Sequence, residues 1–369
     1  MIRGVQTRQI NLDVLRSLAM LMVVIWHFFY YAIGAHSFPT STLGFVNYAL
    51  SEIIVIGSNV CVNIFILLAS YFLLDRPFNT KRILLLWFQV VFYSIGFCLL
   101  GSVTFAKGLA FGDILHAVFP VTNNTYWFFT DYIGLVILAP FLSKTASALS
   151  KKSYLYLLFA LLILCCTFSL FIPLGNTMGA AKGYSLLWFI ALFFWGAYCR
   201  KFGASLSKQR YLLFYLITVV FVFLFCAGKA MYRYLSTGSA PELEFLAYNG
   251  LAFPLAILLF LVFLKSTGTS SFLSSILSKV SPYSFGVYLI TEHFLIRPIL
   301  WETGIQWPVF LNSPWLIPLS LTFCIIVFFT CIGIDWVRAQ LFKLTQLPIF
   351  CEKCSQWLST KIDLLFSHL

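Results

Sequence analysis

Long apolar segments recur throughout the chain, and they limit its possible folds more than any other feature. A helix of about 20 apolar residues crosses the hydrocarbon core of a bilayer, which is about 30 Å thick. The chain has 369 residues, of which 61% are hydrophobic and only 10% are charged, and a soluble core does not need so much apolar sequence. We therefore predict an all-α integral membrane protein with about ten transmembrane helices, at residues 12–33, 53–74, 83–103, 126–143, 153–172, 185–200, 210–227, 248–265, 283–301 and 315–338.

The positions of the basic residues predict how the protein lies in the membrane. Cytoplasmic segments of membrane proteins carry an excess of lysine and arginine. If the N-terminus is cytoplasmic, the basic residues among the 24 that fall in outside segments are Lys107, Lys182, Lys229, Arg233 and Arg297. An even number of spans then places both termini in the cytoplasm. Topology thus explains the net charge of +12, and we expect the bilayer, and no nucleic acid, as a partner.

The chain shows no internal repeat and no segment with the composition of an added soluble domain. We predict one transmembrane domain at residues 1–345, followed by a cytoplasmic C-terminal tail at 346–369. Two connecting segments, 107–120 on the outside and 266–282 on the inside, predict short helices along the membrane surface. Cys351 and Cys354 form a CxxC pair, and because no second pair completes a ligand set, we predict no metal site.

The first apolar segment, NLDVLRSLAMLMVVIWHF, contains three polar residues that could carry chemistry: Asp13, Arg16 and His27. Eleven residues separate Arg16 from His27, which corresponds to three helical turns plus about 20°, so both side chains project from nearly the same face. Arg16 near the cytoplasmic boundary could bind a phosphate, and Asp13, one turn earlier, could hold its guanidinium. His27 could exchange a proton with a hydroxyl group near neutral pH. The structural alternative is a histidine that only bonds a neighbouring helix.

Two further groups of polar residues lie toward the predicted outer ends of spans. Trp127, Asp131 and Tyr132 combine aromatic faces with a carboxylate, as sugar recognition requires, although an aromatic belt at the interface would also explain Trp127. Glu292 could order His27 or the acceptor, or it could form a purely structural contact with Arg297 on the same helix face.

At this point the sequence resembles the acyltransferase-three family of bacterial integral membrane O-acyltransferases. The arginine, the ten intervening residues and the histidine of the first span match its hallmark, and Asp13 stands one turn earlier, as in the family. The segments GSNVCVNIFILLASYFLLDR at 57–76, YWFFTDYIGLVILAPFL at 126–142 and SPYSFGVYLITEHFLIRPIL at 281–300 also resemble family helices, in the same order.

This resemblance implies transfer of an acyl group, usually acetyl, from acetyl-CoA or another acyl-CoA to a hydroxyl of a cell-surface polysaccharide or its lipid-linked precursor. It implies a multi-pass protein of the bacterial plasma membrane, with Arg16 and His27 as catalytic residues and Arg16 also in contact with the donor. Acyl-CoA would be a co-substrate, and no permanently bound cofactor is expected. A transporter or flippase of a glycolipid or small solute is the alternative function.

The sequence departs from the family pattern in three places. Ala69 and Ser70 stand where many members have a serine–glycine pair, and Thr291 stands near the position of a family histidine. An RxxR motif near the turn between the second and third spans is replaced by basic residues at another spacing. One of these, Arg82, is a candidate for donor binding, although orientation by positive charge is the default role of such residues.

Overall fold

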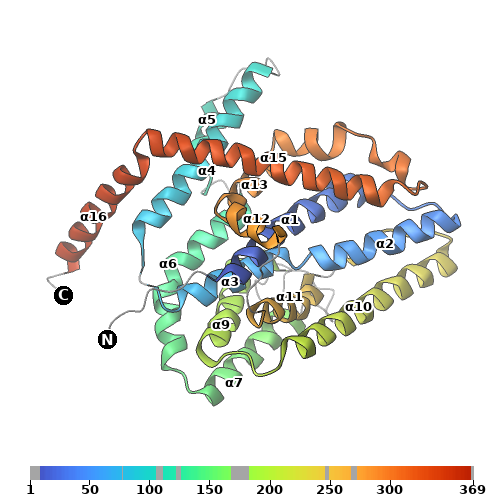
Figure 1. Ribbon diagram of the computed structural model, residues 1–369, viewed down its shortest axis with the longest axis horizontal. Helices are drawn as coiled ribbons and strands as arrows, with labels where there is room; N and C mark the ends of the chain where they lie inside the picture. The colour runs from blue at the N-terminus through green and yellow to red at the C-terminus, as the bar shows by residue number, and fades with distance from the viewer. Residues whose placement is uncertain are drawn as a thin grey trace.

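The computed structural model describes residues 9–76, 78–104, 111–121, 126–167, 183–245, 249–266 and 272–366. Every regular element within these ranges is a helix (Figure 1). Six helices are long and apolar enough to cross a membrane, at Ile10–Ile33, Thr42–Leu73, Thr80–Gly101, Trp127–Ala148, Lys208–Thr237 and Leu316–Leu344. The predicted all-α membrane class is therefore confirmed, whereas the total of ten spans and the cytoplasmic position of both termini stay predictions.

The α-helices follow one another along the chain with short connections. Their bounds are Ile10–Phe28 (α1), Thr42–Ser58 (α2), Cys61–Leu73 (α3), Thr80–Thr104 (α4), Phe111–Val118 (α5), Trp127–Ala148 (α6), Lys151–Leu162 (α7), Leu186–Phe202 (α9), Lys208–Thr237 (α10), Asn249–Leu264 (α11), Phe272–Val280 (α12), Ser284–Thr291 (α13), Ile296–Pro298 (α14), Leu316–Leu344 (α15) and Leu347–Phe366 (α16). Turns of π-helix extend α1 at Phe29–Ile33, α7 at Ile163–Thr167 and α14 at Ile299–Thr303.

The second predicted span is longer than expected and is broken. A helix was expected at 53–74, but α2 already begins at Thr42, where the Ser41 side chain accepts a hydrogen bond from the Gly44 N–H. The apolar pattern hides this start because Glu52 interrupts it, although the side chain of Glu52 is buried inside the protein. α2 ends at Ser58 and α3 starts at Cys61, so the break lies within an apolar run.

The ninth predicted span, 283–301, is also interrupted. α13 ends at Thr291, and the short α14 begins only at Ile296. Pro298 explains part of the break, because a proline lacks the N–H of a helix and its ring excludes the carbonyl four residues earlier. The break places Glu292 at the C-terminal end of a buried helix and not in the middle of a span.

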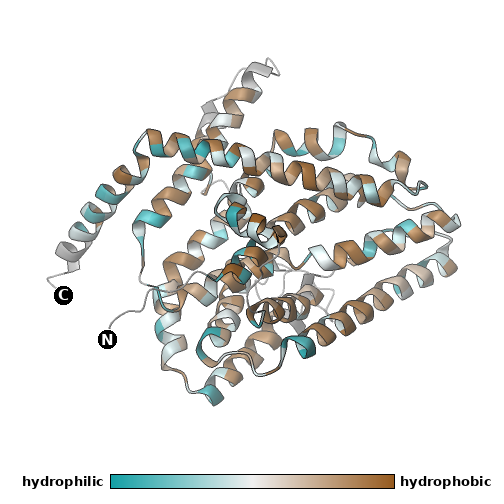
Figure 2. Cartoon of the chain, in the orientation of Figure 1, coloured by the Kyte–Doolittle hydropathy of each residue, from teal (hydrophilic) through white to brown (hydrophobic). Residues whose placement is uncertain are grey.

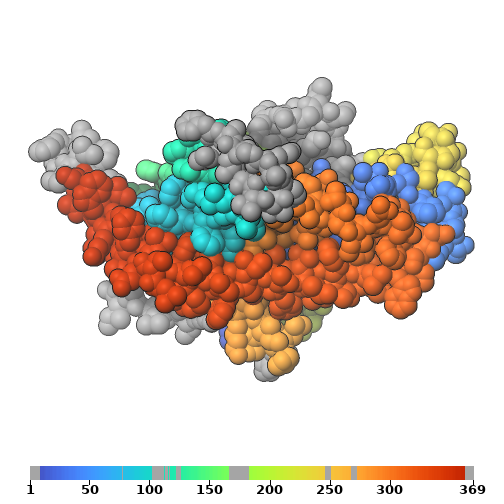
Figure 3. Space-filling model, turned by 90° about the horizontal axis from the view of Figure 1, so that it is seen from above, coloured from blue at the N-terminus to red at the C-terminus, as the bar shows by residue number. Residues whose placement is uncertain are grey.

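The connecting segments contain the short helices that their spacing predicts, as far as they are described. α12 lies in the segment 266–282 and projects from the body of the molecule (Figure 3). α5 lies in the segment 107–120, of which residues 107–110 fall outside the described ranges, as do 168–172 of the fifth predicted span. α16 occupies most of the predicted tail, and it follows a break at Gln346, whose φ is 54°.

α1 lies at the centre of the bundle, in contact with α2, α3, α11, α12, α13 and α15. Apolar residues dominate most helices (Figure 2), with hydrophilic stretches at several helix ends and on α16. On α10 large apolar side chains such as Phe221 and Leu224 are more than 60% exposed on the isolated protein. Such exposure is expected of a helix face that meets lipid.

The closest helix contact to be tested lies between α3 and α9. A Cβ added to Gly196 of α9 would come within 2.7 Å of both the Leu67 carbonyl oxygen and the Ser70 Cβ of α3. Small residues at helix interfaces allow backbones to approach in this way. Ser70, one of the positions that depart from the family pattern, therefore lies directly opposite a required glycine.

We predict that Gly196→Ala lowers the thermal stability of the purified protein, because the added methyl group must push α9 away from the α3 backbone. The expected loss is about 1–3 kcal/mol. Gly228→Ala on α10 is the control, because no atom lies within 4 Å of its added Cβ and alanine is the better helix former. Equal melting temperatures for the two variants would contradict the prediction.

Candidate active site

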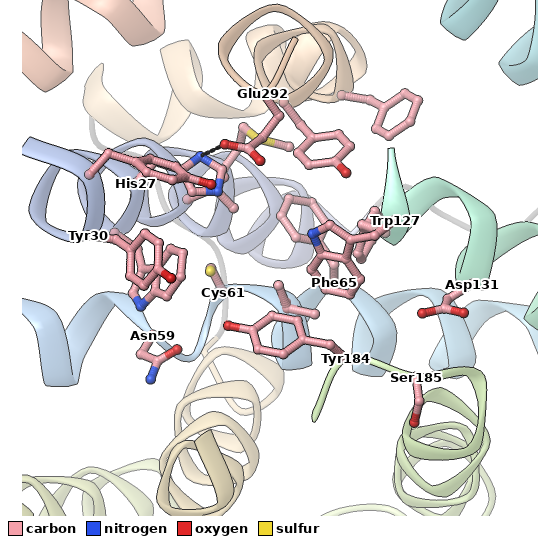
Figure 4. Close-up of a pocket in the computed structure, with 18 of the residues that line it drawn as sticks. His27, Tyr30, Asn59, Cys61, Phe65, Trp127, Asp131, Tyr184, Ser185 and Glu292 are labelled. Carbon is pink, nitrogen blue, oxygen red and sulfur yellow. Dashed lines mark ion pairs between the residues drawn. The ribbon is translucent and has the colours of Figure 1, made fainter. Parts of the chain in front are cut away.

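The candidate site is built around His27, near the C-terminal end of α1. The His27 side chain is buried, and its Nδ1 lies 3.4 Å from Glu292 Oε1 at the end of α13 (Figure 4). A carboxylate beside Nδ1 favours the tautomer that carries its proton there, which leaves Nε2 free to accept a proton. The two residues are 265 positions apart in the sequence, so only the packing of α13 against α1 creates this pair.

A cavity of about 700 Å³ lies against this pair. Its walls come from α1, the break between α2 and α3, the start of α6, the start of α9 and α13. Trp127 and Asp131 line it from α6, as Glu292 does from α13. Figure 4 shows Trp127 and Asp131 on the opposite side of the view from His27. The structure thus brings together four of the residues selected from the sequence.

Arg16 occupies a different environment from His27, although both lie on one face of α1. The described residues of α1 that line the cavity include Met20, Val23 and His27, and Arg16 lies one turn beyond Met20. Its Nη1 is 3.2 Å from Asp13 Oδ1 and 3.4 Å from Ser281 Oγ. The predicted shared cavity therefore stops one helical turn short of Arg16.

A second, smaller pocket of about 150 Å³ lies near Arg16. Arg76, Asn79 and Arg82 line it from the region between α3 and α4, and Tyr132 lines it from α6. The charges of Arg76 and Arg82 lie close enough to act on the Arg16 guanidinium. This pocket is therefore positively charged and suited to an anion.

The two pockets separate residues that the sequence analysis had placed in one group. Asp131 and Tyr132 are neighbours on α6, but a step of about 100° per residue turns them toward different pockets. The Phe128 ring, which lines the larger cavity, stacks on the Tyr132 ring with centroids 6.0 Å apart. This part of α6 therefore separates the two pockets.

Several cavity residues were missed in the sequence analysis. Trp26, Tyr30 and Tyr31 of α1 and its π-turn line the cavity together with Asn59, at the break between α2 and α3. The Arg297 guanidinium lies 5.0 Å from the Tyr31 ring centroid. The aromatic run that follows His27 and the asparagine within an apolar run were the available signals. Among the described residues, no three His, Cys, Asp or Glu side chains form a group that could hold a metal ion.

The fold and the site together define a multi-helix membrane protein with a histidine–carboxylate pair beside an internal cavity. The sequence model of the family described as acyltransferase domain matches residues 9–334. The chain belongs to this acyltransferase-three family, which confirms the resemblance seen in its motifs. No match was found among curated proteins or among solved structures.

We predict that Glu292→Gln lowers kcat for acyl transfer by about 10²-fold or more, because glutamine keeps the size of the side chain but cannot hold the same tautomer or stabilise a charged His27. The KM for the acyl donor should stay the same, since the donor pocket is elsewhere. Glu302→Gln, at an exposed position, is the matched control. A Glu292→Gln enzyme with full kcat would exclude a role for the pair.

Proposed function

We propose that the protein is an O-acyltransferase that moves an acetyl group from acetyl-CoA to a hydroxyl of a cell-surface polysaccharide or its lipid-linked precursor. The observation that carries this proposal is the buried pair of His27 and Glu292 beside a cavity of about 700 Å³, in a chain of the acyltransferase-three family. This family membership favours a transferase over the transporter or flippase that remained the alternative.

In the proposed reaction His27 is the general base. Nε2 takes the proton of the sugar hydroxyl while the hydroxyl oxygen forms a bond to the thioester carbonyl carbon. The resulting tetrahedral intermediate breaks its C–S bond, and the CoA thiolate leaves with the proton that His27 held. Glu292 stabilises the imidazolium that exists between these two steps.

The acyl donor would bind with its phosphates at the smaller pocket. Arg82 and Arg76 line that pocket, and Arg16 lies close enough to feel their charge. Guanidinium groups form strong, often bidentate contacts with phosphate. The flexible arm that carries the thioester would then extend past Phe128 and Met20 toward His27. Acyl-CoA serves here as a co-substrate, and the proposed chemistry requires no resident cofactor.

The acceptor would occupy the larger cavity. Trp127 offers an aromatic face there, and Asp131 offers a carboxylate that can accept hydrogen bonds from sugar hydroxyls. Tyr132 would act on the donor side, since it lines the smaller pocket. We place the enzyme in the bacterial plasma membrane, where a cytoplasmic donor and an extracytoplasmic glycan can reach one site from opposite sides.

We predict that His27→Ala lowers acyl transfer by about 10²- to 10⁴-fold, which is the usual contribution of a general base. Membranes that contain the protein would receive labelled acetyl-CoA, and label in the surface glycan would be counted. His36→Ala, at an exposed position, should keep wild-type transfer. Normal labelling by a stably inserted His27→Ala protein would remove the proposed mechanism.

A second prediction concerns the donor pocket. Arg82→Gln should raise the KM for acetyl-CoA about tenfold, which corresponds to about 1.4 kcal/mol, because one phosphate contact is lost. The kcat at saturating donor should change little. Arg210→Gln, at an exposed position on α10, controls for the loss of one positive charge. An unchanged KM in Arg82→Gln would place donor binding elsewhere.

A further inference from the structure

The larger cavity has an aromatic surface beside its catalytic histidine that no part of the proposed mechanism uses. The rings of Trp26 and Tyr30 stack nearly parallel, with centroids 4.8 Å apart and an angle of 12° between their planes. Both residues line the cavity, and Trp26 also packs edge-on against His27 at 5.6 Å between ring centroids. Tyr30 remains 44% exposed. A flat ring in this position can pack against the C–H face of a pyranose ring.

Polar groups lie across the cavity from this aromatic pair. Asp131 has no hydrogen-bond or ion-pair partner among the described residues, and its side chain lies on the opposite side of the view from Tyr30 (Figure 4). Asn59 lies below Tyr30 in the same view and supplies an amide to the cavity wall. An amide and a carboxylate around an aromatic face are the groups that bind the hydroxyls of an uncharged sugar.

The charges of the cavity select against acidic sugars. Among its described lining residues, the charged side chains besides His27 are Asp131 and Glu292, and both are carboxylates. Arg297 is the nearest described cation to this end, but its guanidinium is held over the ring of Tyr31 and does not line the cavity. A carboxylate on the acceptor would meet two like charges in a site with little water, where repulsion is strong.

The smaller pocket has the opposite character, because Arg76 and Arg82 line it and Arg16 lies nearby. The protein thus presents positive charge where an anionic donor would bind and negative charge where the acceptor would bind. This contrast would keep each substrate out of the other's pocket.

Building on the proposed function, we infer that the acceptor is a pyranose without a carboxylate, packed on the Trp26–Tyr30 pair and bonded by Asn59 and Asp131. Uronic and sialic acids are excluded as the acylated residue. Trp26 and Tyr30 therefore select the sugar, while His27 activates its hydroxyl.

The direct test identifies the sugar that carries the acyl ester. The gene would be deleted in the cells from which the chain comes, and the surface glycans of parent, deletion and complemented cells would be compared by NMR and mass spectrometry. We expect an ester that is lost on deletion, restored by the wild-type chain and attached to a sugar without a carboxylate. An ester on a uronic or sialic acid would overturn the inference but leave the proposed function standing. If deletion removes no ester, the proposed function itself fails, and the inference fails with it.

A kinetic test addresses the aromatic pair. Glycan purified from the deletion cells would serve as acceptor for the wild-type, Tyr30→Ala and Trp26→Ala proteins. We expect the acceptor KM to rise about tenfold or more in each variant, with the acetyl-CoA KM unchanged. Tyr156→Ala removes an aromatic ring that is 64% exposed on α7 and should behave as wild type. An unchanged acceptor KM in both cavity variants would show that the pair does not bind the sugar.

Discussion

The fold depends on one constraint, which is that polar groups carried by apolar helices must find partners inside the protein. Glu52 meets it by accepting hydrogen bonds from the backbone N–H groups of Glu244 and Phe245, at 3.1 and 2.7 Å. This contact ties α2 to the segment that follows α10. A buried polar group of this kind is costly unless it is bonded, so it fixes the position of the segment that bonds it.

Asp335 on α15 satisfies the same constraint between other helices. Its Oδ1 accepts hydrogen bonds from Gln89 and Tyr93 of α4, both at 2.9 Å, and its carboxylate also pairs with Arg338. Truncation of one partner in such a network leaves a buried charge exposed to apolar surroundings. The network therefore holds α4 and α15 together on one side of the bundle, while α1 passes through the centre.

The pair of His27 and Glu292 differs from these structural networks in the number of its partners. Asp335 is surrounded by donors, whereas His27 Nδ1 faces a single carboxylate oxygen at 3.4 Å, and both residues border a cavity. A histidine that only joined two helices would not need such a cavity. In the proposed reaction this arrangement leaves one imidazole nitrogen available for a substrate, and α6 keeps the donor and acceptor pockets apart.

The sequence by itself determined the membrane class, the family and the candidates Arg16 and His27, because apolar length and helical spacing are local properties of the chain. It could not determine which residues share a pocket. Asp131 and Tyr132 are adjacent in sequence, yet they line different pockets, and Arg16 lies one turn beyond the cavity that His27 borders. The contact of Glu292 with His27, the break at Asn59 and the Trp26–Tyr30 pair in the cavity wall arise only when α13, α3 and α6 pack around α1. Tertiary structure decided these features because each depends on the rotation and depth of one helix against another, which no single segment specifies.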